Sequence, residues 1–561
     1  MTSVYEQRPW LKHYPSWIQA DLEVPRENNV QVFKRAVAAR ASSPAIYYFG
    51  RSISYGEVDQ WSDALAVALQ ERGLHKGDRV VLYLQNVPQF IIGQLAVWKA
   101  GGIVVPLNPM FKEKELDYYF QDSGAKALVA LGSTYEAAGR AVVEKLGISN
   151  VITTAGLDFL LPGEPVPKVL QDETRKRFPG TEDLIEILER YQGRTPQPTT
   201  VSPEDPAYFT YTSGTTGPPK GAMNTHGNVV FNAKFYTVGF QLNLKDVVLG
   251  VAPLFHVTGQ VAHLACAAYA GIPVILFFRF DPEEALKLVE RWGATMTVGS
   301  ITVFIALMNH PDMKKRDFST MTKVYSGGAP VSPAIVEGFQ KASGAYIHNI
   351  YGLTETNSPS HFTPLGAKAP VDSVSGALAV GLPVPNSISK IVDLEEGKRE
   401  LPPGEVGEIV VKGPMVIPGY WNKPEETAHA IRDGWLHTGD VGKMDEEGWF
   451  YVVDRKKDLI IVSGYKVWPR DVEDVLYQHP GVKEAAVVGV PDSYRGETVK
   501  AFVALKEESK DKVTPGELME FCKSRMAAYK YPRMVEIVPE VPKTLTGKFL
   551  RRVLREEGKK R

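Results

Sequence analysis

The chain has 561 residues, of which 44% are apolar and 23% are charged, a composition typical of a globular protein with room for several cores. Its 64 basic and 65 acidic residues leave a formal net charge of -1, which excludes a general attraction to polyanions and so disfavours nucleic acid as a partner. Two cysteines, Cys266 and Cys522, are too few for a disulfide framework or a cysteine metal site. With no secretory signal pattern at the start, a reducing, cytoplasmic location is expected.

The first part of the chain alternates between short apolar runs and amphipathic segments. Two short strands are predicted within 43–58, and the helix after them places Val58, Trp61, Leu65 and Leu69 at spacings of three and four residues. Such alternation predicts parallel sheets covered by helices. Further strands are expected at 78–84, 103–107 and 125–131, and further helices at 88–102 and 114–124.

The middle of the chain is less regular. Residues 162–205 are polar and rich in proline, which predicts a long surface connection rather than core. The stretch 259–278 approaches the ~20 residues that span a bilayer, but its polar residues and Pro273 favour a buried helix followed by a core strand. A helix is expected over 281–293, with an Asp-Pro start and a glycine stop. Short alternating strands with tight turns follow from 374 to 453.

The last hundred residues are predicted to form a separate small α+β domain after the charged segment 454–458. Its expected elements are a helix from Pro469, strands at 483–490 and 499–505, a helix at 514–526 and a basic amphipathic end.

The segment YFTYTSGTTGPPKGAM (208–223) gives the strongest chemical signal. A strand-like lead runs into small hydroxyl residues and glycines, which can surround phosphate oxygens, and Lys220 supplies a point charge. Gly221 stands where a Walker sequence needs Ser or Thr, so P-loop kinases and ATPases are disfavoured, and a plain surface turn is the alternative. The loop residues are Thr212, Ser213, Gly214, Thr215, Thr216 and Gly217.

Five further segments accompany this loop: YSGGAP (325–330), YGLTET (351–356), WLHTGD (435–440), DRKKDLIIVSGYKVWPRDVE (454–473) and PKTLTGKFLRR (542–552). With them the chain resembles the acyl-adenylate-forming superfamily of acyl-CoA synthetases, peptide adenylation domains and luciferases. The resemblance implies an α/β fold, with a large N-terminal domain (1–456) of parallel sheets and a small β-barrel-like part, and a small mobile α+β C-terminal domain (457–561). It also implies that ATP and a carboxylate form acyl-AMP, from which a thiol takes the acyl group.

An adenine slot is suggested by paired glycines and an aromatic ring. Gly327 and Gly328 allow a flat ligand to lie against bare backbone, and Tyr351 offers a stacking face. Thr354 could reach a phosphate, and Glu355 is the hard oxygen ligand that Mg²⁺ prefers beside a triphosphate. The resemblance adds Ala329 and Gly352 to this slot and marks Thr354 and Glu355 as catalytic.

The remaining site residues are assigned by the resemblance. It implies that Asp440 and Arg455 bind the ribose, that Lys457 is the hinge between the domains, and that Lys548 bridges the substrate carboxylate and the α-phosphate in the transition state. A surface salt bridge or a solvated basic tail is the alternative for these charged groups. Gly464, Tyr465 and Lys466 are expected to border the channel of the CoA thiol.

The segment PLFHVTG (253–259) indicates which class of carboxylic acid is the substrate. Peptide adenylation domains carry an aspartate after this phenylalanine to bind an amino group, whereas this chain has His256, expected at the mouth of an acyl pocket. The segments resemble long-chain fatty acyl-CoA synthetases most. Ile301 stands where relatives usually carry proline, so a different backbone path is open there.

Three alternatives stay open: a medium-chain or aryl acid-CoA ligase, a luciferase-like oxygenase that uses the same adenylate, and a nucleotide-binding relative without catalysis. A homodimer and a peripheral contact with a membrane are compatible with a fatty acid substrate. The small-molecule partners expected are fatty acid, ATP and CoA, with Mg²⁺ as the metal.

Overall fold

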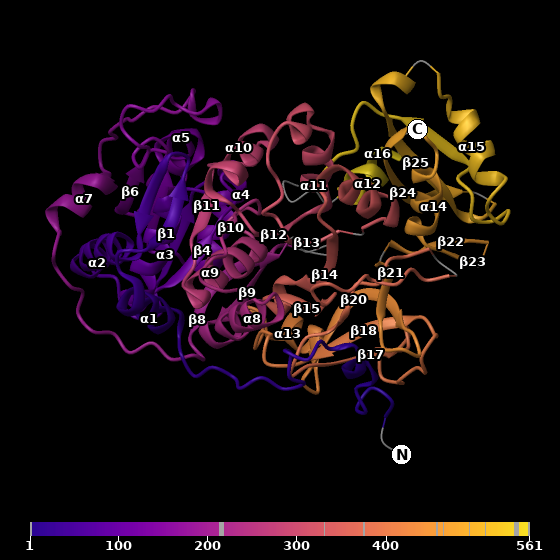
Figure 1. Ribbon diagram of the computed structural model, residues 1–561, viewed down its shortest axis with the longest axis horizontal. Coiled ribbons are helices and arrows are strands. Elements are labelled where there is room, and N and C mark those ends of the chain that lie inside the picture. The colour runs from indigo at the N-terminus through magenta and orange to yellow at the C-terminus, as the bar shows by residue number, and fades with distance from the viewer. Residues whose placement is uncertain are drawn as a thin grey trace.

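A computed structural model gives the fold of the chain (Figure 1). It describes residues 3–212, 218–329, 331–373, 376–455, 458–463, 465–492, 494–510, 512–543 and 549–558. Within these ranges the strands form four sheets, two in the first two thirds of the chain and two smaller ones after residue 387. This agrees with the α/β class and with the large and small parts predicted from the sequence.

A seven-stranded sheet is built from the first third of the chain and the β8–β9 hairpin, in the order β7-β6-β5-β3-β4-β8-β9. The first six strands in this order, from β7 through β6, β5, β3 and β4 to β8, pair in parallel with their neighbours, whereas β8 and β9 pair antiparallel. The strands are β3 (Arg79–Tyr83), β4 (Ile103–Pro106), β5 (Ala127–Leu131), β6 (Asn150–Thr154), β7 (Glu182–Asp183), β8 (Pro206–Thr212) and β9 (Lys220–Thr225).

A nine-stranded sheet follows the order β16-β15-β14-β13-β12-β10-β11-β1-β2. Its six central strands, from β14 to β1, pair in parallel, and the strands outside them pair antiparallel. The strands are β1 (Pro44–Tyr48), β2 (Arg51–Ser54), β10 (Val248–Leu249), β11 (Val274–Leu276), β12 (Met296–Gly299), β13 (Lys323–Ser326), β14 (Ile347–Leu353), β15 (Ser358–Phe362) and β16 (Leu382–Pro383).

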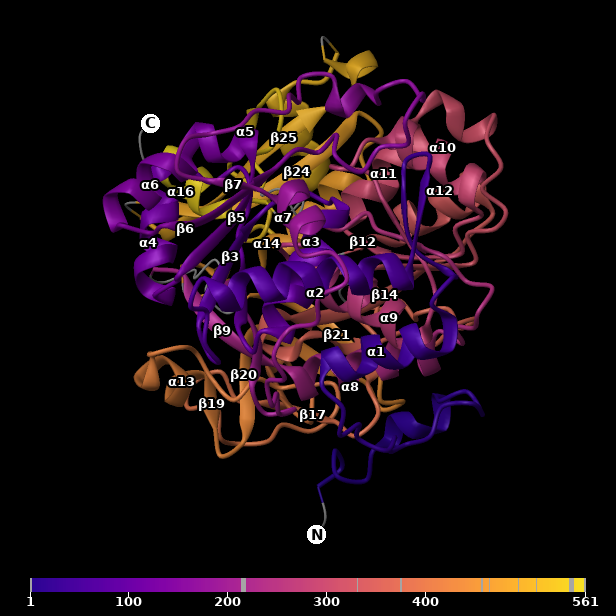
Figure 2. The same ribbon diagram turned by 90° about the vertical axis from the view of Figure 1, so that its left-hand side faces the viewer.

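Helices cover these sheets, and Figure 2 shows α1 and α2 packed together on the side away from the C-terminal lobe. The expected helix 281–293 is confirmed: the Asp281 carboxylate caps it by accepting from the N–H of Glu284 at 3.0 Å, and Gly293 ends it at φ 63°. The helices are α1 (Asn29–Arg40), α2 (Tyr55–Glu71), α3 (Pro88–Lys99), α4 (Glu113–Ser123), α5 (Gly132–Thr134), α6 (Arg140–Leu146), α7 (Leu184–Arg190), α8 (His226–Gly239), α9 (Cys266–Ala270), α10 (Pro282–Trp292), α11 (Ile301–Asn309) and α12 (Pro333–Ser343).

The prediction that 162–205 is only a surface connection is wrong for its middle. Strand β7 and helix α7 lie there, and Leu184 and Ile187 of α7 are fully buried. Asp183 starts the helix by accepting from the N–H of Ile185 at 2.9 Å. The flanking prolines dominate the composition of the segment, whereas the short apolar run inside it is sufficient for two turns of core helix.

The stretch 259–278 is a π-helix over Gly259–Ala265, helix α9 and strand β11, as predicted. Residues of the π-helix and β11 are buried, and Gly271 ends α9 in the left-handed region at φ 69°. Among the residues that the structure describes, no helix is long and apolar enough to cross a membrane.

The strands predicted after residue 374 form a five-stranded antiparallel sheet, which is the lower right part of Figure 1. The N-terminal segment wraps onto it: Trp10 is fully buried and lies edge-on against Phe450, with ring centroids 6.1 Å apart. The elements are β17 (Ile388–Val392), β18 (Gly407–Lys412), α13 (Pro424–Ala430), β19 (Ile431–Arg432), β20 (Trp435–Met444) and β21 (Phe450–Arg455).

The C-terminal part is a five-stranded sheet with apolar clusters on both faces, and it forms the yellow lobe of Figure 1. Its helices and central strands are those predicted from the sequence. The elements are β22 (Ile460–Val462), β23 (Tyr465–Val467), α14 (Pro469–Tyr477), β24 (Val482–Asp492), β25 (Gly496–Leu505), α15 (Pro515–Lys523), β26 (Met534–Ile537) and α16 (Arg551–Gly558).

Candidate active site

The candidate site lies where strands of the two large sheets end. Strand β8 ends at Thr212, β13 ends directly before Gly327, and β14 ends directly before Thr354. Asn224, on β9, donates a hydrogen bond to the carbonyl of Thr354 at 2.9 Å, so the two sheets are joined at this edge. Open α/β sheets bind ligands beyond the carboxyl ends of their parallel strands, which makes this edge the natural place for a ligand.

The phosphate-binding loop predicted from the sequence spans the β8–β9 hairpin. Thr212 and Lys220 face each other as the last paired residues of the two strands. Ser213, Gly214, Thr215, Thr216 and Gly217 lie outside the described residues. The antiparallel ladder therefore fixes both ends of the predicted loop at the carboxyl end of β8.

Buried asparagine side chains hold the segment that contains Glu355. Asn224 also donates to the Asn357 side-chain oxygen at 2.9 Å, and Asn232 of α8 donates to the carbonyls of Thr356 at 2.9 Å and Asn357 at 2.7 Å. The three asparagines are fully buried, and Asn357 adopts the left-handed conformation at φ 53°, which asparagine tolerates better than most residues. A short 3₁₀ turn, Thr354–Thr356, is thereby fixed with its polar side chains at the sheet edge.

Tyr420 connects two of the predicted residues and was not predicted itself. Its hydroxyl donates to Oε1 of Glu355 at 2.7 Å, and the Nζ of Lys220 lies 4.9 Å from the centroid of its ring. Burial, and then the adjacent Glu355 carboxylate, raise the pKa of Tyr420 well above its usual value, so the phenol stays a donor. The sequence signal was PGYW (418–421), which carries no chemical motif by itself.

Glycines of the predicted adenine slot allow close approach of backbone. A Cβ on Gly327 would lie 2.6 Å from the carbonyl oxygen of Ile350, and one on Gly352 would lie 1.5 Å from that of Ser358. Gly328 has φ 79°, in the left-handed region, and Ala329 follows it at the end of the described segment. These glycines are therefore required by the packing of β13, β14 and β15, as well as by the proposed contact with a ligand.

The two predicted ligands of adenine and ribose lie together. The Tyr351 hydroxyl donates to Oδ2 of Asp440 at 2.8 Å, and Asp440 is only 5% exposed. Glu408 accepts from the N–H of Gly439 at 3.0 Å and so fixes the strand where Asp440 lies. Arg455 is the cross-strand partner of Asp440 in the β20–β21 ladder, although its side chain lies outside the described part.

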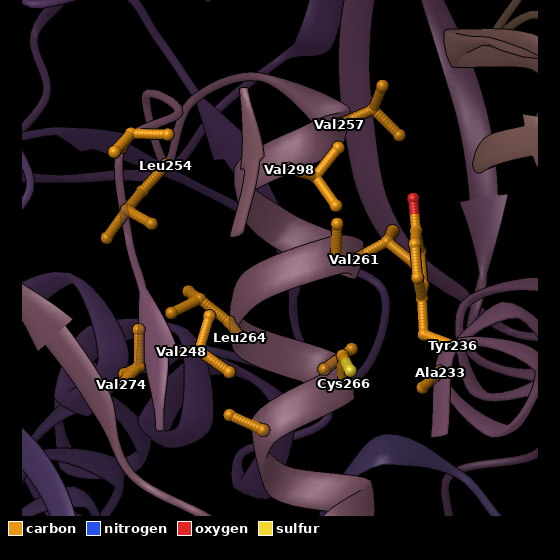
Figure 3. Close-up of a cluster of buried hydrophobic side chains, with 14 of the residues drawn as sticks. Ala233, Tyr236, Val248, Leu254, Val257, Val261, Leu264, Cys266, Val274 and Val298 are labelled. Atoms are coloured by element: carbon orange, nitrogen blue, oxygen red, sulfur yellow. The ribbon is translucent and has the colours of Figure 1, made fainter. Parts of the chain in front are cut away.

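His256 lies on a different element, directly before the helix that leads into the core. Its Nδ1 is 3.2 Å from the Thr258 hydroxyl. Behind it, Val257, Val261 and Val298 belong to a buried apolar cluster, in which Tyr236 of α8 lies beside Val261 (Figure 3). The Tyr236 hydroxyl is 2.7 Å from that of Ser358, so this cluster extends to the segment that carries Glu355.

Helix α11 begins at Ile301, with Ser300 in the extended N-cap conformation. Ile301 is thus the first helical residue, a position that suits proline equally well, and the helix could start at the same point with either residue.

The C-terminal site residues are described only in part. Lys457, Gly464 and Lys548 lie outside the described residues, as does the side chain of Lys466, whose backbone belongs to β23. Tyr465 is 58% exposed and stacks on Tyr529 with ring centroids 4.7 Å apart. The roles that we assigned to these residues from the sequence stay predictions.

Comparison with known proteins supports one family for the whole chain. The profile of the AMP-binding enzyme family matches residues 33–421, and that of its C-terminal domain matches residues 471–548. The long-chain-fatty-acid–CoA ligase of Bacillus subtilis (strain 168) is 38% identical over 564 residues, covering 98% of each chain. That of Escherichia coli O6:H1 (strain CFT073) is 36% identical over 566 residues, covering 99% of each chain.

Solved structures agree with this result. The crystal structure of the anthranilate CoA ligase AuaEII in complex with anthranoyl-AMP superposes with a TM-score of 0.84 at 25% identity, covering 97% of this chain and 99% of that one. The family profiles, the full-length similarity and the shared fold lead to the same conclusion: the chain belongs to the AMP-binding enzyme family.

Proposed function

We propose that this protein is a fatty acid-CoA ligase. The observation that carries the proposal is the full-length similarity to long-chain-fatty-acid–CoA ligases, on a chain in which Tyr420 contacts both Lys220 and Glu355. In the first step a carboxylate oxygen attacks the α-phosphorus of ATP, and the bond to pyrophosphate breaks. In the second step the CoA sulfur attacks the acyl carbon, and AMP leaves.

The large part of the chain supplies groups suited to ATP. Tyr351 offers a ring for the adenine, and Asp440 can accept from ribose hydroxyls at its buried position. Lys220 carries a positive charge at the end of the predicted phosphate loop, where it would contact phosphate oxygens. We assign binding and orientation of ATP to this set.

The residues present fit Mg²⁺ bound together with ATP. Within the described ranges no cluster of three or more His, Cys, Asp or Glu forms a metal cage. Mg²⁺ in nucleotide enzymes is often held by one or two carboxylates plus phosphate oxygens and water, and Glu355, half-buried with one oxygen on Tyr420, can supply that carboxylate. When bound there, Mg²⁺ would neutralise charge on the phosphates.

The small C-terminal part is proposed to supply the catalytic lysine and the thiol channel. We retain the boundary of residues 1–456 and 457–561, with Lys457 as the hinge, as part of this proposal. Lys548 precedes α16 by three residues, which would place its charge at one end of that helix. Gly464, Tyr465 and Lys466 would border the CoA arm.

The acyl group is proposed to enter the apolar cluster behind His256. Tyr236 links that cluster to Ser358, three residues after Glu355, so the carboxylate end of the acid would lie near the nucleotide. Each buried methylene contributes about 0.8 kcal/mol, and the depth of this site would therefore select chain length. An aryl acid is the second candidate, because a solved structure of similar fold is an anthranilate CoA ligase.

Acid-dependent ATP-pyrophosphate exchange tests the proposal. We expect exchange with fatty acids, rising with chain length, and weaker exchange with benzoate. The strongest exchange with benzoate would favour the aryl ligase, and no exchange with any acid would refute the ligase function. Light emission with a luciferin and oxygen would support the luciferase-like alternative, whereas ATP binding without exchange would support a relative that has lost catalysis.

A homodimer, a peripheral contact with a membrane and a cytoplasmic location stay predictions from the sequence.

A further inference from the structure

Tyr420 contacts two site residues that come from different parts of the chain. Its hydroxyl donates to Glu355, on the segment after β14, and its ring lies under the ammonium group of Lys220, at the start of β9. A tyrosine can make both contacts at once because its hydroxyl is polar and its ring face attracts cations. The geometry therefore couples the carboxylate and the lysine through one side chain.

Backbone contacts hold Tyr420 rigidly in this position. The N–H of Met223 donates to the carbonyl of Gly419 at 3.0 Å, and the N–H of Trp421 donates to that of Gly221 at 2.8 Å, so 419–421 lies along β9. The Tyr420 N–H donates to the Thr427 hydroxyl at 2.9 Å. The side chain is 7% exposed. Its hydroxyl is thus a fixed point against which Glu355 is oriented.

The segment just before Tyr420 also holds the backbone of Glu355 in place. The N–H of Ile417 donates to the Glu355 carbonyl at 3.0 Å. With the backbone held at one end and Oε1 held by Tyr420 at the other, the carboxylate has one defined direction. Among the described residues, the second oxygen, Oε2, accepts no hydrogen bond. That oxygen therefore keeps its capacity to accept from, or coordinate, a ligand.

We propose that Tyr420 is a positioning residue for the metal-bound nucleotide: its hydroxyl orients Glu355 toward Mg²⁺, and its ring holds the Lys220 ammonium at the start of β9, where it would meet phosphate oxygens. This inference rests on the proposed function, because it assumes that ATP binds at this edge. It assigns separate effects to the hydroxyl and the ring. The hydroxyl affects only the part of ATP binding that depends on Mg²⁺, whereas the ring affects ATP binding with or without the metal.

Two substitutions separate these effects. Tyr420→Phe keeps the ring and removes the hydroxyl, so ATP affinity without Mg²⁺ should stay unchanged while the gain in affinity on adding Mg²⁺ falls about tenfold, the scale of one hydrogen bond to a charged group. Tyr420→Leu also removes the ring, and should weaken metal-free ATP binding about threefold, on the scale of an exposed cation-π contact.

Tyr191→Phe is a matched control. Tyr191 is also 7% exposed, and its hydroxyl donates to Oε2 of Glu71 at 2.6 Å, away from the site. This substitution removes an equivalent hydrogen bond and should leave ATP affinity unchanged in both conditions. Thermal unfolding of each variant shows whether the fold is retained.

The experiment is calorimetric titration of the full chain with ATP, with and without Mg²⁺ and with no acid present. The same titration compares Glu355→Ala with the double variant that also carries Tyr420→Phe. If the added Tyr420→Phe change still lowers the Mg²⁺-dependent affinity for ATP, the hydroxyl does not act through Glu355 and the inference is wrong. The inference is also wrong if Tyr420→Phe retains its fold and adding Mg²⁺ raises its ATP affinity as much as it does in the unsubstituted protein. Failure of the unsubstituted protein to bind ATP would instead overturn the proposed function, and the inference with it.

Discussion

The nucleotide side of the large part and the C-terminal lobe are held by different kinds of polar contact. The contacts that hold the backbone of the segment around Glu355 are neutral: amides of Asn224, Asn232 and Asn357 donate to backbone carbonyls or to one another in a fully buried network. In the C-terminal lobe they are ionic. The Arg551 guanidinium makes two hydrogen bonds to the Glu473 carboxylate, at 2.7 and 2.8 Å.

The ionic contacts reach the region where the hinge is predicted. Arg551 also lies 3.4 Å from Asp458, and Arg555 pairs with the same carboxylate. Asp458 directly follows the predicted hinge residue Lys457, and Arg551 follows Lys548 by three positions. Neutral buried hydrogen bonds hold one geometry at any ionic strength, whereas ion pairs weaken with salt. The predicted nucleotide site and the C-terminal lobe are thus held by different chemistry.

The largest expected effect is on the rate of acyl-AMP formation, and it comes from a substitution in the C-terminal part. Lys548→Ala should slow acyl-AMP formation by about 10²- to 10³-fold, the scale of losing one preorganised electrostatic group. ATP affinity, which we assign to the large part, should stay unchanged. Single-turnover formation of acyl-AMP, with ATP binding measured separately, checks this, and acyl-AMP formed at the normal rate would contradict the role of Lys548.

The next effect tests the neutral network. Asn232→Ala leaves the carbonyls of Thr356 and Asn357 without their buried donor, and should lower the free energy of unfolding by about 3 kcal/mol. Because no charge is involved, the loss should be the same at low and high salt. Urea unfolding at two salt concentrations measures it. A loss that changes strongly with salt would show that the comparison of the two regions is wrong.

The matching test of the lobe is Arg551→Met. It leaves the nearly buried Glu473 without its ionic partner, although the Val487 N–H still donates to Oε1 at 2.8 Å. We expect the lobe to lose about 2 kcal/mol of stability at low salt, and the difference from the unsubstituted protein to shrink modestly at high salt, since a largely buried pair is screened less than an exposed one. Hydrogen exchange of amides in α16 and β24 reports on the lobe alone. No salt dependence would contradict the account.

The last effect concerns pH, and it is absent at neutral pH, where the other substitutions are measured. Burial lowers the pKa of His361 from 6.5 to about 3, so the folded protein keeps it neutral while the unfolded chain takes up a proton below 6.5. Stability due to this residue is therefore present above pH 6.5 and falls by about 1.4 kcal/mol for each pH unit from there toward 3. His361→Phe should remove that part of the slope in urea unfolding at several pH values. An unchanged slope would contradict the assignment.

Much of the fold was predictable because local signals agree with tertiary structure. The Asp281 cap, the Pro282 start and the Gly293 stop define α10 completely, and the alternating apolar runs and helical patterns located β1 to β5 and α2 to α4. Helix α7 was missed because its apolar residues are few and prolines surround them. Local composition there pointed to a loop, whereas burial of Leu184 and Ile187 decides the structure.

The site was predictable only where a residue carries its own chemistry. Lys220, Glu355, Tyr351 and Asp440 were proposed from motifs, and the structure places Tyr351 in direct contact with Asp440 and joins Lys220 to Glu355 through Tyr420. Tyr420 could not be proposed, because its role comes from contacts with residues 65 and 200 positions away in the chain. The asparagine network was missed for the same reason.

The measurement that tests the account most directly is product analysis of the full chain with ATP, Mg²⁺, CoA and a long-chain fatty acid. The account predicts acyl-CoA, with AMP and pyrophosphate formed in equal amounts to it, and loss of all three products in Lys548→Ala at early times. Formation of ADP and phosphate, or acyl-CoA without AMP, would contradict it.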